Sequence, residues 1–307
     1  MLAFLFPGQG SQSPGMGKDL HDAAAVCRRT FEEADAALDF PLSRACFEGP
    51  ADALKMTATA QPAILAASVA ALRLLAERGG APGIVAGHSL GEYSALVAAG
   101  ALDFADALRL VRARGLYMQE AVPVGEGSMA AVIGLDRDAI ESVCAEAAQG
   151  RVVSAANLNG PGQTVISGHA DAVERAMVLA RERGALKAIP LEVTAPFHCA
   201  LMQPAADRLA IDLKAAAFGN LTIPLVANVT ATAVRDGDAA RALLVRQVTA
   251  PVRWEESVKT LAELGVTKAF EVGPGKVLAG LVRRIDRRID CAPAGTLEAI
   301  QAAGVAP

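Results

Sequence analysis

The chain has few aromatic residues and no excess of positive charge. Phe, Trp and Tyr make up 4% of its 307 residues, and there is a single Trp. Lys and Arg number 29 against 33 Asp and Glu, which gives a net charge of −4 at pH 7. Few rings are available to stack on bases, and the overall charge does not attract a polyanion. We therefore expect no nucleic acid partner and no anionic membrane partner.

Long apolar runs, paired cysteines and nucleotide-binding motifs are also missing. No run approaches the ~18 apolar residues of a transmembrane helix. The apolar start, residues 1–6, lacks a basic leader and is interpreted as a strand, not a signal peptide. The five cysteines are scattered and include no Cys-x-x-Cys pair, which favours free thiols in a reducing cytosol. Gly8-x-Gly10 is too short for a dinucleotide fingerprint, and no phosphate-binding loop motif occurs. We expect a cytoplasmic protein with no bound cofactor and no metal.

Helix-like and strand-like segments alternate along the chain, which predicts an α/β fold. A hydrophobic content of 52% is enough for one large core or for two domains. The Ala/Gly-rich tail from Pro293 is expected to be loosely held. Strands are expected over 2–6, 83–88, 222–228 and 267–272, and helices over 20–38, 61–78, 90–99, 104–120, 199–215, 238–248, 254–264 and 275–284.

The pattern changes near residues 123–127, where a second unit begins. Its predicted order is strand 128–134, helix 136–149, strands 151–157 and 163–167, helix 170–184 and strand 186–193. This βαββαβ order is typical of a ferredoxin-like domain. We therefore predict a small ferredoxin-like domain at 125–194. It would be inserted into a large, α/β-hydrolase-like domain with a parallel-sheet core, made of residues 1–124 and 195–307.

Ser89 is the first candidate for chemistry. It lies in Gly87-His88-Ser89-Leu90-Gly91, after the apolar run 84–86 and before a helix-forming run through Ala99. Strand, sharp turn with Ser, then helix is the layout of a nucleophile elbow, in which the flanking glycines allow close backbone approach. The pattern favours a nucleophilic serine. The alternative is a tight turn in which Ser89 only caps the helix.

A serine nucleophile needs a base, and His198 is the best placed of the four histidines. It follows Pro196 at the junction where the small domain rejoins the large one, and clefts form at such junctions. An interfacial histidine with no catalytic role is the alternative. His88 is interpreted as a packed or hydrogen-bonded support, because adjacent residues point apart. No Asp or Glu between Ser89 and His198 has the position of a triad acid, which favours a neutral acceptor.

Two further features are candidates for binding the reacting group. Gly8-Gln9-Gly10 follows the first strand, and its backbone N–H groups could form half of an oxyanion hole or a plain glycine-rich turn. Arg114 lies with Arg109 and Arg112 on the helix after Asp103. Such a helix usually presents its arginines to solvent, so the residues alone leave a ligand role for Arg114 open.

Taken together, the segments resemble the malonyl-CoA:acyl carrier protein transacylases of fatty acid synthesis and the acyltransferase domains of polyketide synthases. The most distinctive are Pro-Gly-Gln-Gly-Ser-Gln at 7–12, Gly-His-Ser-Leu-Gly-Glu-Tyr-Ser-Ala at 87–95 and Ala-Pro-Phe-His-Cys at 195–199. The remaining matches, in order up to about residue 284, are 114–115, 118–123, 157–159, 165–168, 247–248, 251–254 and 271–278.

The resemblance implies a role for each matching position. Ser89 would carry the malonyl group as an ester, and His198 would act as base and then as acid. Gln247 would replace the triad acid through its backbone carbonyl. The backbone N–H groups of Gln9 and Leu90 would form the oxyanion hole.

The resemblance also implies how the acyl group is selected. Arg114 would pair with the free malonyl carboxylate, and its buried charge would disfavour acetyl-CoA. Leu90 and Phe197 would crowd a methyl branch on the acyl group. Three further residues would line the cleft: Met118, Asn157 and Asn159.

The implied reaction is ping-pong transfer from malonyl-CoA to the phosphopantetheine thiol of an acyl carrier protein in fatty acid biosynthesis. The alternatives are a serine esterase or thioesterase, and the acyltransferase component of a polyketide synthase or a malonate decarboxylase. Because the carrier is expected to be acidic, its docking surface should be basic; ordinary solvated helix faces are the alternative. The candidates are Arg283, Arg284, Arg287, Arg288, Lys187, Arg181 and Arg183.

Overall fold

The larger of two sheets is built mainly from parallel strands. The computed structural model describes residues 1–193 and 195–304. Strand order in this sheet is β10-β9-β1-β2-β7-β8, and all neighbours run parallel except β7 and β8. The strands are β1 (Leu2–Phe6), β2 (Ile84–Gly87), β7 (Leu225–Val226), β8 (Ala233–Val234), β9 (Lys268–Glu271) and β10 (Asp290–Pro293).

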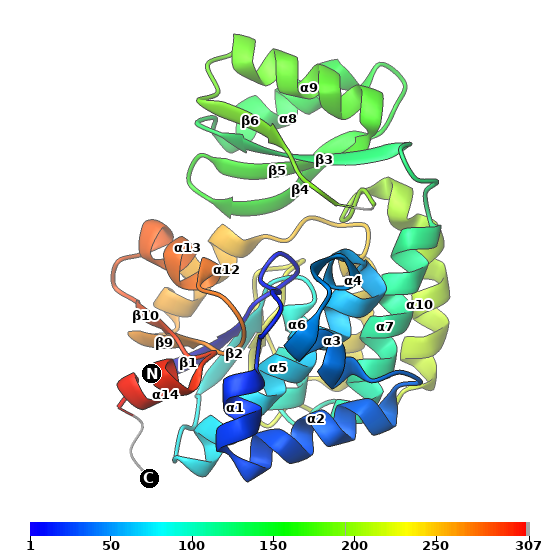
Figure 1. Cartoon of the computed structure of the whole chain (residues 1–307). Coiled ribbons are helices and arrows are strands. Elements are labelled where there is room, and N and C mark those ends of the chain that lie inside the picture. The colour runs from blue at the N-terminus through cyan, green and yellow to red at the C-terminus, as the bar shows by residue number, and fades with distance from the viewer. Residues whose placement is uncertain (194, 305–307) are drawn as a thin grey trace.

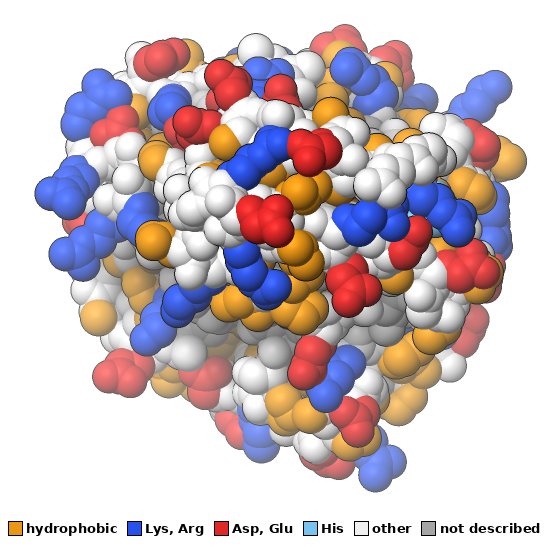
Figure 2. Space-filling view, turned by 90° about the horizontal axis from the view of Figure 1, so that it is seen from above, with side chains coloured by type: hydrophobic (Ala, Val, Ile, Leu, Met, Phe, Trp, Pro, Cys, Tyr) orange, Lys and Arg blue, Asp and Glu red, His pale blue; other side chains and the backbone are white. Residues whose placement is uncertain are grey.

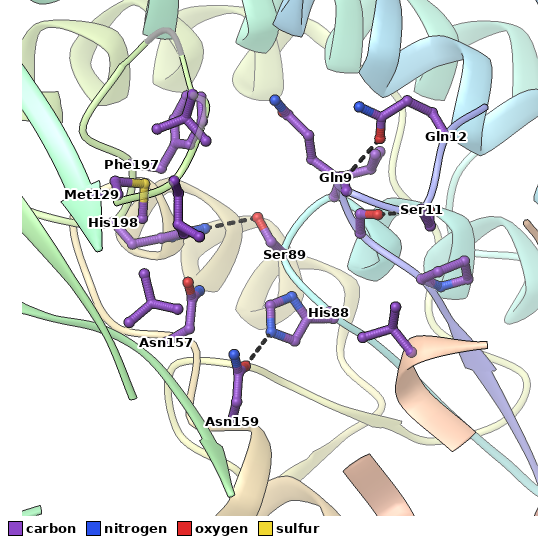
Figure 3. Close-up of a pocket in the computed structure, with 18 of the residues that line it drawn as sticks. Gln9, Ser11, Gln12, His88, Ser89, Met129, Asn157, Asn159, Phe197 and His198 are labelled. Atoms are coloured by element: carbon purple, nitrogen blue, oxygen red, sulfur yellow. Dashed lines mark hydrogen bonds between the residues drawn. The ribbon is translucent and has the colours of Figure 1, made fainter. Parts of the chain in front are cut away.

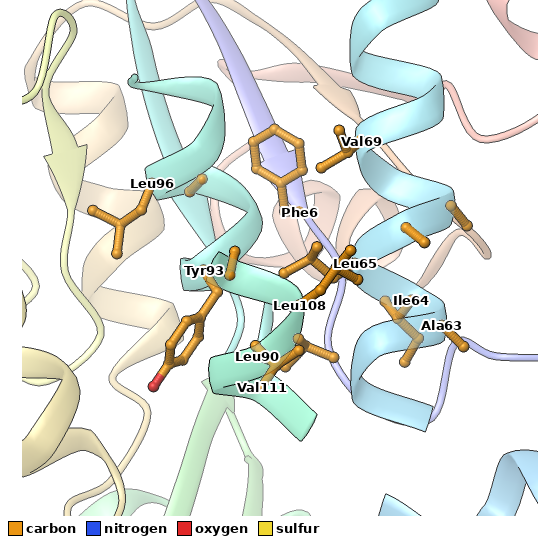
Figure 4. Close-up of a cluster of buried hydrophobic side chains, with 14 of the residues drawn as sticks. Phe6, Ala63, Ile64, Leu65, Val69, Leu90, Tyr93, Leu96, Leu108 and Val111 are labelled. Carbon is orange, nitrogen blue, oxygen red and sulfur yellow. The ribbon is translucent and has the colours of Figure 1, made fainter. Parts of the chain in front are cut away.

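Alternate side chains of β1 enter separate cores on the two faces of this sheet. Phe4 and Phe6 pack with α2 (Ala25–Ala37), α5 (Thr57–Glu77), α6 (Gly91–Ala98) and α7 (Phe104–Glu120). Figure 4 shows this core around Phe6, with side chains from α5, α6 and α7. Ala3 and Leu5 pack instead with α12 (Trp254–Glu263) and α13 (Val277–Ile285). Burial on both faces explains why the strand is apolar throughout.

The remaining helices of this part cover its edges and ends. Helix α10 packs against α7, and α11 packs against α10. In Figure 1, α1 to α4 lie with α5 on the same side of the large sheet. The bounds are α1 (Lys18–Ala23), α3 (Leu42–Glu48), α4 (Ala51–Lys55), the 3₁₀ turn η1 (Ala200–Met202), α10 (Gln203–Ala215), α11 (Gly237–Gln247) and α14 (Leu297–Ala302).

The second sheet is antiparallel, with the strand order β4-β5-β3-β6. Its element order matches the ferredoxin-like pattern, so the predicted fold class is confirmed. Helices α8 and α9 cover the face turned away from the large sheet (Figure 1). The elements are β3 (Gly127–Ile133), α8 (Arg137–Ala148), β4 (Val153–Gly160), β5 (Gln163–His169), α9 (Ala170–Glu182) and β6 (Lys187–Pro190).

Alternation along β3 directs side chains to both sides of the small sheet. Ala130 and Val132 pack under α8 and α9. Met129 and Ala131 point the other way and line a cavity between the two sheets. The edge strand β4 of the small sheet is joined to the large part by a hydrogen bond from the Leu158 N–H to the Val252 carbonyl oxygen, at 2.9 Å. The two sheets therefore enclose a cleft.

Several predicted boundaries are wrong. The helix expected at 20–38 is divided into α1 and α2, which meet at the extended Ala24. The helix expected from residue 61 begins at Thr57, so Pro62 lies inside it. The strand expected over 222–228 is reduced to β7, because the chain turns at 227–232 to form the short hairpin with β8. Helices α3 and α4 were not predicted.

The C-terminal tail is held more firmly than its composition predicts. Strand β10 pairs with β9, and Ile300 of α14 is fully buried. Thr296 caps α14 by accepting the Ala299 N–H, and the Asp19 carboxylate accepts the Leu297 N–H. The expectation of a loose tail from Pro293 is therefore wrong up to residue 304, and residues 305–307 lie outside the described part.

Helix α5 is long and largely apolar, and it lies in the core of the fold. By length and composition alone it could cross a membrane, with a mean hydropathy of 1.4 over its most apolar window. Within the fold, 83% of that window is buried, against α2 and α7 among others. Its apolar surface is thus used in the core of the larger part.

Candidate active site

Ser89 lies on a sharp turn between β2 and α6. Its φ of +51° is in the left-handed region, which is unfavourable for a residue with a side chain by about 1–2 kcal/mol. Glycine is required on both sides. A Cβ on Gly87 would lie 1.9 Å from the carbonyl carbon of Gly91, and one on Gly91 would lie 2.1 Å from the Phe6 oxygen. The Gly-x-Ser-x-Gly segment therefore has the geometry of a nucleophile elbow.

The Ser89 hydroxyl faces His198, as Figure 3 shows. Ser89 Oγ lies 2.8 Å from His198 Nε2, and His198 Nδ1 lies 2.7 Å from the backbone oxygen of Gln247. The Nδ1–H donates to that carbonyl, which leaves Nε2 free to accept the serine proton. His198 also has a positive φ, +60°. The structure thus brings together Ser89, His198 and the Gln247 carbonyl without a carboxylate.

Burial keeps His198 neutral. Its side chain is almost entirely covered, and this burial, followed by the nearby positive charge of Arg114, lowers its pKa to about 3. The hydrogen bond to Gln247 opposes the shift. A neutral imidazole is the form that can accept a proton from the hydroxyl.

Arg114 belongs to α7 but faces the interior. Its side chain is 2% exposed. One terminal nitrogen, Nη2, donates to Ser89 Oγ and to Gln247 Oε1, both at 3.0 Å. The other, Nη1, donates to Gln61 Oε1 at 2.8 Å. The sequence left open whether Arg114 faces solvent or the site. In the structure its side chain is buried beside Ser89.

A cavity of about 430 Å³ opens in front of Ser89. The turn after β1 contributes Gln9, and the turn after β2 contributes Leu90. Neither backbone N–H of these two residues has a hydrogen-bond partner in the described part of the chain. Other lining residues that were expected from the sequence are Arg114, Met118, Asn157, Asn159, Phe197 and His198. Gln247 is fully buried behind the cavity and does not line it.

The family match agrees with this geometry. A family model described as "acyl transferase domain" matches residues 3–299. The chain belongs to this acyl transferase family. A relative from Escherichia coli (strain K12), named malonyl CoA-acyl carrier protein transacylase, is 54% identical over 285 residues, which cover 92% of each chain.

Solved structures resemble this acyl transferase over nearly its whole length. The malonyl CoA-acyl carrier protein transacylase of Coxiella burnetii shares 47% identity, with a TM-score of 0.96 over 98% of this chain and 96% of that one. A malonyl-transacylase solved in complex with its type II polyketide synthase acyl carrier protein shares 48% identity, with a TM-score of 0.96 over 98% of each chain.

His88 of the acyl transferase is a hydrogen-bonded support. Its Nε2 lies 2.9 Å from Asn159 Oδ1 (Figure 3). The centre of its ring lies 5.5 Å from that of Trp254. Burial lowers the pKa of His88, so it too stays neutral. His88 thereby joins the serine turn to strand β4 of the small sheet.

Three residues of the site were not found by sequence reasoning. Gln61 of α5 accepts the Arg114 bond, Asn228 accepts the Ser89 N–H through Oδ1 at 2.7 Å, and Glu92 is fully buried beside Gln247. Glu92 lies within the recognised segment 87–95, which is the signal that could have singled it out. Asn228 follows a short strand and has no such signal. Among the described residues, no group of His, Cys, Asp or Glu could hold a metal ion.

Proposed function

We propose that this acyl transferase moves the malonyl group from malonyl-CoA to the phosphopantetheine thiol of an acyl carrier protein. The names of its relatives point to this reaction. The observation that carries the proposal is the buried Arg114, whose Nη2 lies 3.0 Å from Ser89 Oγ. A guanidinium beside the nucleophile can bind the carboxylate at the far end of a short acyl chain.

In the first half-reaction, Ser89 Oγ attacks the thioester carbonyl while its proton passes to His198 Nε2. The carbonyl oxygen becomes an oxyanion, which the unpaired N–H groups of Gln9 and Leu90 stabilise. Collapse of this intermediate breaks the carbon–sulfur bond. His198 then gives its proton to the departing coenzyme A thiolate, and the malonyl group remains on Ser89 as an ester.

The second half-reaction reverses these steps with a different thiol. The carrier's phosphopantetheine thiol gives its proton to His198, and the thiolate attacks the ester carbonyl. Ser89 Oγ leaves and takes the proton back from His198. Because the two substrates react in turn at one serine, the mechanism is ping-pong.

Selection of malonyl over acetyl follows from the burial of Arg114. With acetyl-CoA the site would keep a buried cation without a carboxylate partner, which costs free energy. Leu90 and Phe197 line the same cavity and would crowd a methyl branch on the acyl group. Met118, Asn157 and Asn159 would complete the wall of the cleft.

We also propose the domain division that the sequence predicts, with residues 125–194 as the small domain and 1–124 with 195–307 as the large one. The antiparallel sheet of residues 127–190, with its own buried core, supports it. Thr194, at the boundary, lies outside the described residues. A cleft between two domains would keep water from the ester, which a transferase requires and a hydrolase does not. We place the reaction in the cytoplasm, in fatty acid biosynthesis.

Intact-mass measurement after mixing with malonyl-CoA alone tests the proposal. We expect one malonyl group per chain on the wild-type protein and none on Ser89→Ala. Acetyl-CoA and methylmalonyl-CoA should label the wild type much less. Labelling of Ser89→Ala to the same extent, or no labelling of the wild type, would overturn the proposal.

A further inference from the structure

Glu92 is a buried carboxyl group that the reaction described above does not use. It is the second residue of α6, directly after the serine turn, and its side chain is fully buried. Burial raises the pKa of Glu92 to about 7, although two hydrogen bonds and the charge of Arg114 oppose the shift. Burying a carboxyl group costs free energy unless hydrogen bonds replace those lost to water. The hydrogen bonds of Glu92 therefore indicate its role.

Both contacts of Glu92 lead to the active site. Its Oε2 accepts the Gln247 side-chain Nε2–H at 2.8 Å and the Asn228 backbone N–H at 3.1 Å. Its Oε1 is buried and has no hydrogen-bond partner among the described residues. The carboxyl group therefore contacts the two residues that support the serine turn and the histidine.

Gln247 transmits the position of Glu92 to Arg114 and His198. The Gln247 side-chain amide lies between the two charged groups: Nε2 donates to Glu92, and Oε1 accepts from Arg114 Nη2 at 3.0 Å. This orientation directs the positive end of the amide dipole to the carboxyl group and the negative end to the guanidinium. The backbone carbonyl of the same residue accepts the His198 Nδ1–H. One residue thus connects Glu92 to the acyl-binding cation and to the base.

Asn228 transmits the position of Glu92 to the nucleophile. Its backbone N–H is held by Glu92, while its side chain contacts both sides of the serine turn. Oδ1 accepts the Ser89 N–H at 2.7 Å, and Nδ2 donates to the Gly87 carbonyl at 2.6 Å. These bonds hold Ser89 in its left-handed conformation.

We propose that Glu92 is a positioning residue for acyl transfer. Through its hydrogen bonds to Gln247 and Asn228, it fixes the relative positions of Arg114, His198 and Ser89. The inference rests on the proposed malonyl transfer. It predicts that the hydrogen-bond acceptor at position 92 sets both the acylation rate and the preference for malonyl over acetyl. A purely structural role predicts a change in stability alone.

Two substitutions separate these roles. Glu92→Gln keeps the size and one carbonyl oxygen, which can still accept from Gln247 and Asn228, whereas Glu92→Ala removes the acceptor. Glu271→Gln is the matched control, because Glu271 is also fully buried but accepts the N–H groups of Leu278 and Ala279 at the start of α13. Rates of Ser89 acylation by labelled malonyl-CoA and acetyl-CoA are measured for all four proteins, with melting temperatures.

We expect Glu92→Ala to slow malonyl acylation by roughly tenfold or more and to reduce the malonyl-to-acetyl ratio. Glu92→Gln should recover most of both, and Glu271→Gln should leave both unchanged even if it lowers the melting temperature. If Glu92→Ala does not fold, Glu92→Leu, which fills the space but has no acceptor, takes its place. A malonyl-to-acetyl ratio in Glu92→Leu below those of Glu92→Gln and Glu271→Gln supports the proposal, and equal ratios in all three overturn it. If the wild type is acylated and Glu92→Ala reacts within about twofold of its rate, this inference is wrong but the proposed function stands. A wild type that forms no malonyl ester overturns it together with the proposed function.

Discussion

At the scale of single residues, the Ser89 hydroxyl lies between an acceptor and a donor. Its proton points to His198 Nε2 at 2.8 Å, and its oxygen accepts from Arg114 Nη2 at 3.0 Å. The first contact prepares proton transfer, and the second places a cation where a charged acyl chain would end. His198 and Arg114, the proposed base and the proposed selectivity residue, are therefore each one hydrogen bond from Ser89.

Replacing Arg114 by Ala should change specificity more than general activity. We expect malonyl acylation of Ser89 to fall by roughly a hundredfold or more, because a buried carboxylate loses its partner, whereas acetyl acylation should fall much less. Arg112→Ala is the control, since Arg112 lies on the same helix but packs on the ring of Phe40, outside the cavity. Equal losses of malonyl and acetyl acylation would show that Arg114 is structural.

The pH dependence of acylation should reflect the low pKa of His198. Burial and the charge of Arg114 lower this pKa to about 3, so the base stays neutral as the pH falls through the range in which a free imidazole, with a pKa of ~6.5, is protonated. We expect kcat/KM for malonyl-CoA at pH 5 to stay within about twofold of its value at pH 7.5, because kcat/KM reports the free enzyme. Because burial raises the pKa of Glu92 to about 7, the same profile is measured on Glu92→Gln. A fall with a midpoint near 6.5 in both proteins would contradict the His198 assignment.

Sequence reasoning found the residues that lie together at the proposed active site, but not the residues that support them. Ser89, His198 and Arg114 lie in segments whose residue types signal chemistry, and the family resemblance singled out Gln247. The supports Gln61, Asn228 and Glu92 are defined by contacts across 53, 139 and 155 residues of sequence. No local sequence pattern predicts contacts between residues so far apart in the chain, because these contacts depend on how α5, β7 and α11 pack around α6.

At the scale of elements, the serine turn depends on the close approach of three backbones. Gly91, at the start of α6, lies directly against the carbonyl of Phe6 at the end of β1. Gly87, at the end of β2, lies against Gly91. The strand–turn–helix unit therefore fits only if both positions lack a Cβ atom.

Gly91→Ala should destabilise the fold substantially. The added Cβ would lie 2.1 Å from a backbone oxygen, so β1 or α6 must shift, and we expect a loss of about 3 kcal/mol or more in the free energy of unfolding. Gly280→Ala is the control, because a Cβ there meets nothing within 4 Å and alanine favours a helix by about 0.5–1 kcal/mol. Urea unfolding measures both. A Gly91→Ala protein as stable as Gly280→Ala would contradict the packing described for this turn.

Elements with a clear hydrophobic period were predicted well, and short ones were not. The βαββαβ order and the helix 104–120 were correct, because strands and amphipathic helices repeat their pattern over several residues. Strands β8 and β10 and helices α3, α4 and α14 are too short for a period to appear. The tail shows the physical reason: β10 forms only because β9 offers it an open edge, which the local sequence does not reveal.

At the scale of the whole molecule, the site lies between two sheets, and the face above it mixes charges of both signs. The cavity is lined from β3, β4 and β5 on one side and from the turns after β1 and β2 on the other. Seen from above, Lys and Arg side chains are mixed with Asp and Glu (Figure 2). Recognition of an acidic carrier would therefore depend on a local basic patch rather than on net charge.

Charge reversal on α13 tests the proposed carrier surface. Arg283 and Arg284 are exposed in the last turn of this helix, whose first turn lines the cavity. We expect Arg283→Glu with Arg284→Glu to raise KM for the acyl carrier protein several-fold and to leave KM for malonyl-CoA unchanged. The control reverses Arg28 and Arg29 of α2, which are exposed far from the small sheet (Figure 1). Unchanged carrier kinetics would remove α13 from the docking surface.

The fate of the malonyl ester on Ser89 distinguishes acyl transfer from hydrolysis. Wild-type protein is charged with labelled malonyl-CoA, freed of excess substrate, and divided between buffer alone and buffer with phosphopantetheinylated acyl carrier protein. If Ser89 is a temporary carrier between two thiols, the label stays on the protein in buffer and passes to the carrier when it is added. Steady release of free malonate in both samples would contradict acyl transfer and identify a thioesterase.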